Sequence, residues 1–195
     1  MLENFCVIAS DPARVDEMAR VQREAYPELN DQLWFLAEHY TSHIRQFPEG
    51  QFTLMTADGR IAGAAGTARV NMVEDEIEHT YNDKLGTNHL YKHDPKGEWL
   101  YLADICVHPD FQGLGLTRLL FDAMKNYVRA QAMKGICFGG VLRNYGAVKD
   151  KMSAAEYVAG IEAGKIYDPT VNVHLKRGFQ IRGIIDFYFE APAYD

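Results

Sequence analysis

The sequence has no run of 18 apolar residues, so we expect no transmembrane helix and no membrane partner. Its first residues contain no basic segment followed by an apolar one, and we therefore expect no secretory signal. It also lacks internal repeats and linkers rich in Pro, Gly or Ser. A chain of 195 residues with these properties is expected to form one domain over 1–195.

Cysteine and basic residues are both sparse. The three cysteines, Cys6, Cys106 and Cys137, are odd in number and match no metal-binding spacing. We interpret them as reduced, buried thiols of a cytoplasmic protein. The net charge of −7 and the absence of a basic run argue against a nucleic-acid partner and suit a cationic or neutral small molecule.

The spacing of apolar residues predicts an α/β fold around one mixed sheet. Asp58 and Gly59 are a two-residue hairpin signal, so the first strands should be antiparallel. The apolar run over 99–107, followed by a glycine loop, a helix and another strand, predicts a parallel pair with a right-handed crossover. The expected elements are strands over 5–9, 51–57, 60–71, 99–107, 136–142 and 179–189, with helices beginning near 10, 30, 116, 153 and 168.

Residues 72–98 form a long polar connection with weak periodicity. Seven acidic residues stand against three basic ones there. A connection of this length is usually functional or mobile, and a solvated loop with one short helix is the alternative. We treat it as an acidic insertion between two strands.

A loop over residues 112–117, Gln-Gly-Leu-Gly-Leu-Thr, lies between the central strand and the helix that follows. Such a turn presents backbone N–H groups and the positive end of a helix dipole to an anion. The loop is no dinucleotide fingerprint because Arg118 stands where the third glycine is required. No Gly-Lys-Ser/Thr run exists, which excludes a P-loop.

With the preceding Val107-His108-Pro109, this loop resembles the Arg/Gln-x-x-Gly-x-Gly/Ala signature of the GCN5-related N-acetyltransferase (GNAT) superfamily. A second landmark, the segment over 174–179 that ends in Gly178-Phe179, is similar to the family's last helix. The resemblance implies a single-domain fold with a mostly antiparallel sheet, a splayed parallel pair and helices on both faces. Thr117 departs from the Gly or Ala that the family prefers.

Other segments resemble one subgroup, the acetyltransferase domain that is often fused to a carbon–nitrogen (nitrilase-like) hydrolase. The likeness spans about residues 5–189, so we expect a stand-alone form of that domain. The segments that carry it are 47–51, 78–80, 93–97, 152–157 and 167–169.

The resemblance implies direct transfer of an acetyl group from acetyl-CoA to a small-molecule or protein amine, with no metal and no covalent acyl-enzyme. Backbone of the central strand is expected to pair with the pantetheine arm and the loop to hold the pyrophosphate. Homodimers are frequent in the superfamily, so a homodimer is possible. The predicted donor-binding residues are Cys106, Val107, Gln112, Gly113, Leu114, Gly115, Leu116 and Thr117.

Two residues are candidates for proton transfer. Asp104 is the single charged residue in the apolar central strand, where a carboxylate needs a partner, so it is either a base beside the acceptor or a structural residue. His174 stands where the family commonly has Tyr, and a charged histidine there would protonate the leaving thiolate. The alternatives for the acid are Tyr145, Tyr167 and Tyr188, or no protein acid at all.

Two other interpretations stay open. His89 and His93, four residues apart, would meet as metal ligands on a helix, but no third ligand is evident. The substituted His174 also permits a non-catalytic acyl-CoA-binding sensor or partner-binding module of the same fold.

Overall fold

The computed structural model describes residues 2–29, 33–73, 78–186 and 188, which fall into two compact units. The first comprises Met1–Met72 and Tyr81–Phe138, and the second Val73–Thr80 and Gly139–Asp195. One domain over 1–195 stays a prediction. Among the described residues, no helix has both the length and the apolar content needed to cross a bilayer.

The first unit contains a five-stranded mixed sheet in the order β1-β2-β3-β4-β5. The pairs β1–β2, β2–β3 and β3–β4 are antiparallel, and the pair β4–β5 is parallel. This confirms the predicted mixed sheet, the hairpin at Asp58-Gly59 and the parallel crossover. The strands are β1 (Phe5–Ala9), β2 (Gln51–Thr56), β3 (Ile61–Val70), β4 (Trp99–Val107) and β5 (Gly135–Cys137).

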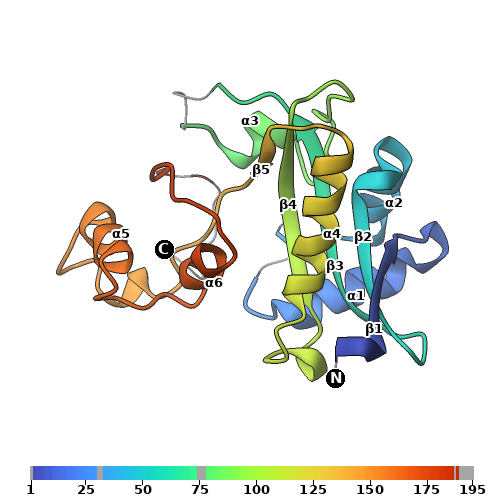
Figure 1. Ribbon diagram of the computed structural model, residues 1–195, viewed down its shortest axis with the longest axis horizontal. Coiled ribbons are helices and arrows are strands. Elements are labelled where there is room, and N and C mark those ends of the chain that lie inside the picture. Colours follow the sequence, from blue (N-terminus) through green and yellow to red (C-terminus); the bar gives the residue numbers. More distant parts are fainter. Residues whose placement is uncertain (1, 30–32, 74–77, 187, 189–195) are drawn as a thin grey trace. The chain divides into compact units, whose positions relative to one another are not determined.

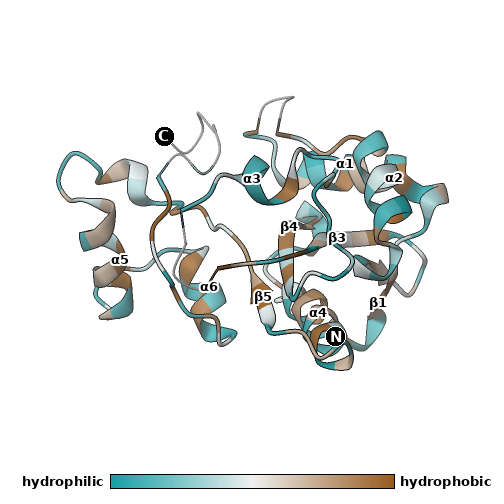
Figure 2. Ribbon diagram, turned by 90° about the horizontal axis from the view of Figure 1, so that it is seen from above, coloured by the Kyte–Doolittle hydropathy of each residue, from teal (hydrophilic) through white to brown (hydrophobic). Residues whose placement is uncertain are grey.

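Helices cover both faces of this sheet, as expected. Helices α1 (Val15–Ala25) and α2 (Ala37–Gln46) lie on one face and α4 (Thr117–Ala130) on the other (Figures 1 and 2). The face of α1 and α2 encloses a core made of Met18, Val21, Phe35, Tyr40, Met55, Ile61, Ala64 and Cys106. Because both faces are covered, β2 and β3 are buried almost throughout.

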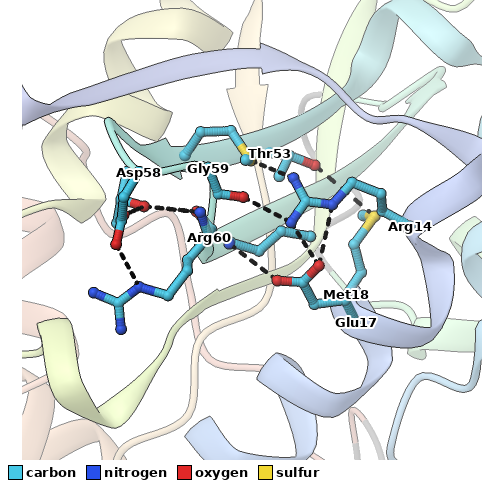
Figure 3. A network of polar contacts seen from close by, with 10 residues as sticks. Arg14, Glu17, Met18, Thr53, Asp58, Gly59 and Arg60 are labelled. Carbon is cyan, nitrogen blue, oxygen red and sulfur yellow. Dashed lines mark hydrogen bonds and ion pairs between the residues drawn. The ribbon is translucent and has the colours of Figure 1, made fainter.

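A polar network ties the start of α1 to the β2–β3 hairpin (Figure 3). The Arg14 guanidinium donates to the Glu17 carboxylate at 2.6 Å and to the Gly59 carbonyl at 2.9 Å. The other Glu17 oxygen accepts the N–H of Ile61 at 3.2 Å. The hairpin is therefore fixed to the helix that covers its face.

Part of the predicted acidic insertion belongs to the first unit, where it forms the short helix α3 (Tyr81–Leu85). Side chains of α2 hold the backbone that follows. Ser42 and Gln46 donate to the carbonyl of His89 at 3.0 and 2.6 Å, and the His43 ring lies 2.5 Å from the Asn88 carbonyl. The segment is thus anchored at its centre. Residues 74–77 of the insertion lie outside the described residues.

The second unit contains α5 (Ala154–Glu162) and α6 (Val171–Lys176), joined through the fully buried Asp168. One Asp168 oxygen accepts the N–H groups of Thr170 and Val171 at the start of α6. The other accepts the Asn144 N–H and the Tyr157 hydroxyl, both at 3.1 Å. Four donors on one buried carboxylate compensate its loss of water.

Several predicted bounds are wrong. The strand predicted over 136–142 ends at Cys137, where its pairing with β4 stops. The strand predicted over 179–189 is absent over 179–186, because the described part of the second unit offers no strand for it to pair with. The helix predicted from Asn30 begins at Ala37, and residues 30–32 lie outside the described residues.

We expect Asp168→Ala to lower the free energy of unfolding by about 3 kcal/mol, because four donors lose their buried acceptor. Urea denaturation followed by circular dichroism would measure the change. The exposed Asp150 provides the control, and Asp150→Ala should have little effect. Equal stability of the two variants would contradict the role of Asp168.

Candidate functional site

The predicted phosphate-binding loop is anchored at its start. The Gln112 amide donates to the Val107 carbonyl at the end of β4 at 3.0 Å. His108 lies 2.7 Å from the Glu24 carboxylate of α1 and accepts the Asp110 N–H. These contacts fix the path of the chain from β4 into the loop.

The glycines of the loop adopt a conformation that other residues avoid. Gly113 and Gly115 have φ values of +76° and +72°, and a Cβ at either would meet no atom within 4 Å. The backbone conformation therefore favours glycine at both positions, and the space in front of them is open. Within the described part of the chain, the N–H groups of 113–116 meet no hydrogen-bond acceptor. The loop therefore presents several free donors to an anion at the start of a 14-residue helix.

The edge of β4 that faces β5 is only partly paired. Strand β5 pairs with Trp99, Leu100 and Tyr101, so the edge from 102 to 107 has no neighbouring strand among the described residues. On the opposite edge β3 pairs with β4 along its length, with a bulge at Ala103. This is the splayed pair that the sequence analysis expected.

The alternation of the β3–β4 ladder decides which backbone groups face this open edge. The His108 N–H donates to the Ala62 carbonyl at 2.9 Å, so Cys106, two residues earlier, also faces β3. Ile105 and Val107 face the open edge. Of the two residues assigned to the pantetheine arm, Val107 has its backbone at this edge, whereas β3 occupies the backbone of Cys106.

Both carbonyls of the open edge already have a side-chain donor. The Tyr26 hydroxyl donates to the Ile105 carbonyl and Gln112 to that of Val107. The N–H of Val107 is left at this edge. Sequence reasoning missed Tyr26, because nothing in its spacing distinguishes it from a core tyrosine.

Asp104 lies beside the bulge, and its Oδ2 atom is buried without a hydrogen-bond partner in the described residues. Burial raises the pKa of this carboxyl to about 7, against hydrogen bonds from the Gln22 side chain and the Ile105 N–H that lower it. A carboxyl that titrates near neutrality is suited to accept a proton from a substrate. Gln22 was missed, although it is a polar residue at an apolar position of the α1 stripe.

His174 belongs to α6 in the second unit, whereas Asp104 belongs to β4 in the first. Burial lowers the pKa of His174 to about 4, and the Arg177 charge adds to this effect. The ring is therefore uncharged near pH 7, whereas the predicted acid role needs the charged form. That role stays a prediction. The Gly178-Phe179 landmark has the expected form, since Gly178 has φ +86° and the Phe179 N–H closes the helix on His174.

His89 and His93 do not form a metal pair. His93 stacks on Phe47 and accepts the Arg69 N–H, whereas His89 lies against His39. Glu38, His39 and His89 bring ligand atoms within 4.8 Å of one another. However, Nδ1 of His39 accepts the Leu36 N–H, so Nε2 carries the proton of the neutral ring. Neither ring nitrogen then has a free electron pair for a metal.

The fold and the loop define an acetyltransferase-type domain, and comparison with known proteins identifies its family. Residues 15–149 match the acetyltransferase (GNAT) family. The chain therefore belongs to this family, which confirms the resemblance seen in its motifs.

Two proteins of Bacillus subtilis (strain 168) are similar in sequence. The "Probable hydrolase YhcX" is 30% identical over 170 residues, which cover 87% of this chain and 32% of that protein. The "Uncharacterized N-acetyltransferase YkwB" is 26% identical over 177 residues, covering 90% of this chain and 78% of that protein. The chain thus spans about a third of the length of YhcX.

Solved structures share the fold. A GNAT-like decarboxylase, GphF, in complex with isobutyryl-CoA has a TM-score of 0.76 at 22% identity, covering 94% of this chain and 90% of that one. The loading GNATL domain of CurA from Lyngbya majuscula has a TM-score of 0.74 at 20% identity, covering 89% and 83%. At these identities the likeness concerns the fold alone.

Asp104 should make the stability of the protein depend on pH. Because its folded pKa is near 7 and its usual value is 3.8, its stabilising contribution is full below pH 4 and is lost as pH rises through 7. We expect Asp104→Asn to gain about 3 kcal/mol of stability relative to wild type between pH 5 and pH 8.

Thermal melts of both proteins at the two pH values would measure this difference. Asp122 on α4 is an exposed acid, and Asp122→Asn is the control that should show no such gain. A difference that is the same at pH 5 and pH 8 would contradict the burial of an ionisable Asp104.

Proposed function

We propose that this protein is an acetyl-CoA-dependent N-acetyltransferase that acts on a small-molecule or protein amine. The observation that carries the proposal is one continuous arrangement in the first unit. A carboxyl with a pKa near 7, an unpaired strand edge and a loop with free N–H groups follow one another along residues 104–117. Each of them suits one part of acyl transfer from a coenzyme A thioester.

The donor would be held along this arrangement. The N–H groups of 113–116 would bind the pyrophosphate, aided by the dipole of α4, whereas the Gln112 N–H already donates to the Pro109 carbonyl. The Val107 N–H would donate to a carbonyl of the pantetheine arm, as an added strand does at a sheet edge. This brings the thioester toward Asp104, which precedes Val107 by three residues.

The reaction proposed is direct transfer. The amine nitrogen attacks the thioester carbon, the C–N bond forms and the C–S bond breaks, with the electron pair leaving on sulfur. Asp104 accepts the proton that the amine loses, which suits a base of pKa near 7. The thiolate, from a thiol of pKa about 8.5, leaves readily and takes a proton from water, because the His174 ring is uncharged near pH 7.

A non-catalytic acyl-CoA-binding module is the second candidate, and the low pKa of His174 favours it because that residue is uncharged at neutral pH. Thiol release from acetyl-CoA across a panel of amines distinguishes the two functions. Binding without turnover on any amine would support the module. The same assay should include propionyl-, succinyl- and malonyl-CoA, because similar folds bind other acyl groups or carry the name decarboxylase.

Acetyl-CoA should raise the melting temperature by mass action once its concentration exceeds the dissociation constant. Gly115→Val should weaken this binding at least tenfold, because a side chain would enter the open space before the loop and φ +72° disfavours it. Calorimetric titration would measure both effects. Gly164→Val, where the glycine has a similar positive φ and open space just after α5, is the control for backbone strain. No melting shift at millimolar acetyl-CoA would refute the donor assignment.

Asp104→Asn should lower kcat/KM by about a hundredfold, the usual contribution of a general base, with little change in acetyl-CoA affinity. Steady-state kinetics with an amine found active in the panel would test this. Wild-type kinetics in the variant would refute the role of Asp104 as base. His174→Ala, measured in parallel, tests the acid role predicted from the sequence, and unchanged turnover would refute that role.

A further inference from the structure

The Tyr26 side chain reaches from the end of α1 to the open edge of β4. Its hydroxyl donates a hydrogen bond to the Ile105 carbonyl, and its ring packs against the core cluster. The backbone of Tyr26 is fixed, because its N–H donates to the Gln22 carbonyl at 3.1 Å and its carbonyl accepts the Trp34 indole N–H at 2.9 Å. The hydroxyl can therefore leave β4 by rotation of the side chain, without movement of the backbone.

The Ile105 carbonyl belongs to the part of β4 that a further strand would pair with. Strand β5 runs parallel to β4, and its pairing stops at Cys137, opposite Tyr101. A parallel neighbour that continued this course would use the Ile105 carbonyl and the Val107 N–H, which lie on the same edge. Residues 103–105 are partly exposed, whereas 100–102 and 106–107 are buried. This stretch of the edge is therefore within reach of a ligand.

The two groups of this edge differ in what they bind. The Val107 N–H has no partner in the described part of the chain, whereas the Ile105 carbonyl has the Tyr26 hydroxyl. A hydroxyl bonded to a carbonyl oxygen lies about 2.7 Å from it, and a neighbouring strand lies about 4.8 Å from β4, so the two contend for the same space. The Gln112 amide, on the Val107 carbonyl, lies beyond this pair of groups and can stay in place.

We propose that Tyr26 is a placeholder for the pantetheine arm. In the coenzyme-free protein its hydroxyl satisfies the Ile105 carbonyl and keeps the edge from pairing with another chain. When acetyl-CoA binds, an amide N–H of the arm replaces the hydroxyl, and a carbonyl of the arm accepts the Val107 N–H. This inference rests on the proposed function, because the arm is its ligand.

The replacement has a consequence for affinity. One hydrogen bond must break before the arm can form another, so the hydroxyl weakens the binding of the coenzyme. Coenzyme A carries the same arm, and its release after the transfer is favoured for the same reason. A tyrosine that only contacted the ligand would have the opposite effect, since its loss would weaken binding.

Tyr26→Phe removes the hydroxyl and keeps the ring. The variant should bind acetyl-CoA about fivefold more tightly than wild type, because the arm then meets an unoccupied carbonyl. ADP has a pyrophosphate but no pantetheine arm, so both proteins should bind it equally. Calorimetric titration measures both affinities. The control is Thr67→Val, which removes a buried hydroxyl that donates to the Gly50 carbonyl at 2.7 Å and should leave both affinities unchanged.

Carbon-13 NMR of the tyrosine Cζ atoms follows the hydroxyl directly. The Tyr26 resonance is assigned by its loss in Tyr26→Phe, and a thermal melt shows that this variant is folded. The resonance should shift when wild type binds acetyl-CoA and stay in place when it binds ADP, because ADP leaves the hydroxyl on Ile105.

Equal or weaker binding of acetyl-CoA by Tyr26→Phe would overturn the inference. So would an equal gain in Thr67→Val or in ADP binding, or a Tyr26 resonance that acetyl-CoA does not move, since the two donors would then share the carbonyl. The proposed function has a separate readout in wild type. If wild type binds neither acetyl-CoA nor ADP, the donor assignment fails and this inference fails with it. If wild type binds acetyl-CoA and Tyr26→Phe gains nothing, only the role of Tyr26 fails.

Discussion

The unequal pairing of β4 is the constraint on which the rest of this structure depends. Strand β3 binds one edge of β4 from end to end, whereas β5 binds the other edge over three residues only. Backbone groups that would be satisfied inside a sheet are thereby left at an edge close to the core. Unsatisfied groups of this kind are costly in a folded protein unless side chains or a ligand complete them. Tyr26 and Gln112 complete the carbonyls of Ile105 and Val107, whereas the Val107 N–H has no partner among the described residues.

The loop after β4 combines rigid flanks with an open centre. Beyond the Gln112 and His108 contacts, the Phe111 ring packs against Phe5 of β1 and under the guanidinium of Arg60. The loop is therefore tied to the far edge of the sheet and to the hairpin. Its two glycines have positive φ values, and the N–H groups of 113–116 have no acceptor among the described residues. A site arranged before its ligand arrives binds with a smaller loss of conformational entropy.

Sequence reasoning predicted the elements whose signals are local. The bounds of β4 follow from an apolar run that only Asp104 interrupts, and the hairpin follows from Asp58-Gly59. It failed where an element depends on a partner. An apolar stretch says nothing about how far a neighbouring strand extends. Strand β5 was therefore predicted too long, and a last strand was predicted over a segment whose described residues, 179–186, form none.

The candidate site shows the same division. The glycine loop and Asp104 are visible in the sequence because glycine and a charge are unusual where they stand. Gln22 and Tyr26 act through side chains that meet β4 only after α1 packs on the sheet. A polar residue in an otherwise apolar helical stripe was the available signal for Gln22. Tyr26 ends α1 and has no comparable signal.

The energetics of Asp104 explain why a protein would keep an incompletely bonded carboxyl in its core. An amine of pKa about 10 gives its proton to a base of pKa near 7 only against a free-energy difference of about 4 kcal/mol. Burial reduces this difference, because transfer of the proton converts a buried ion pair into two neutral groups. Binding an ammonium in turn favours the carboxylate, since the two equilibria are linked. In the proposed reaction, the same low-polarity surroundings that destabilise the free protein above pH 7 would therefore favour the proton transfer that releases the nucleophile.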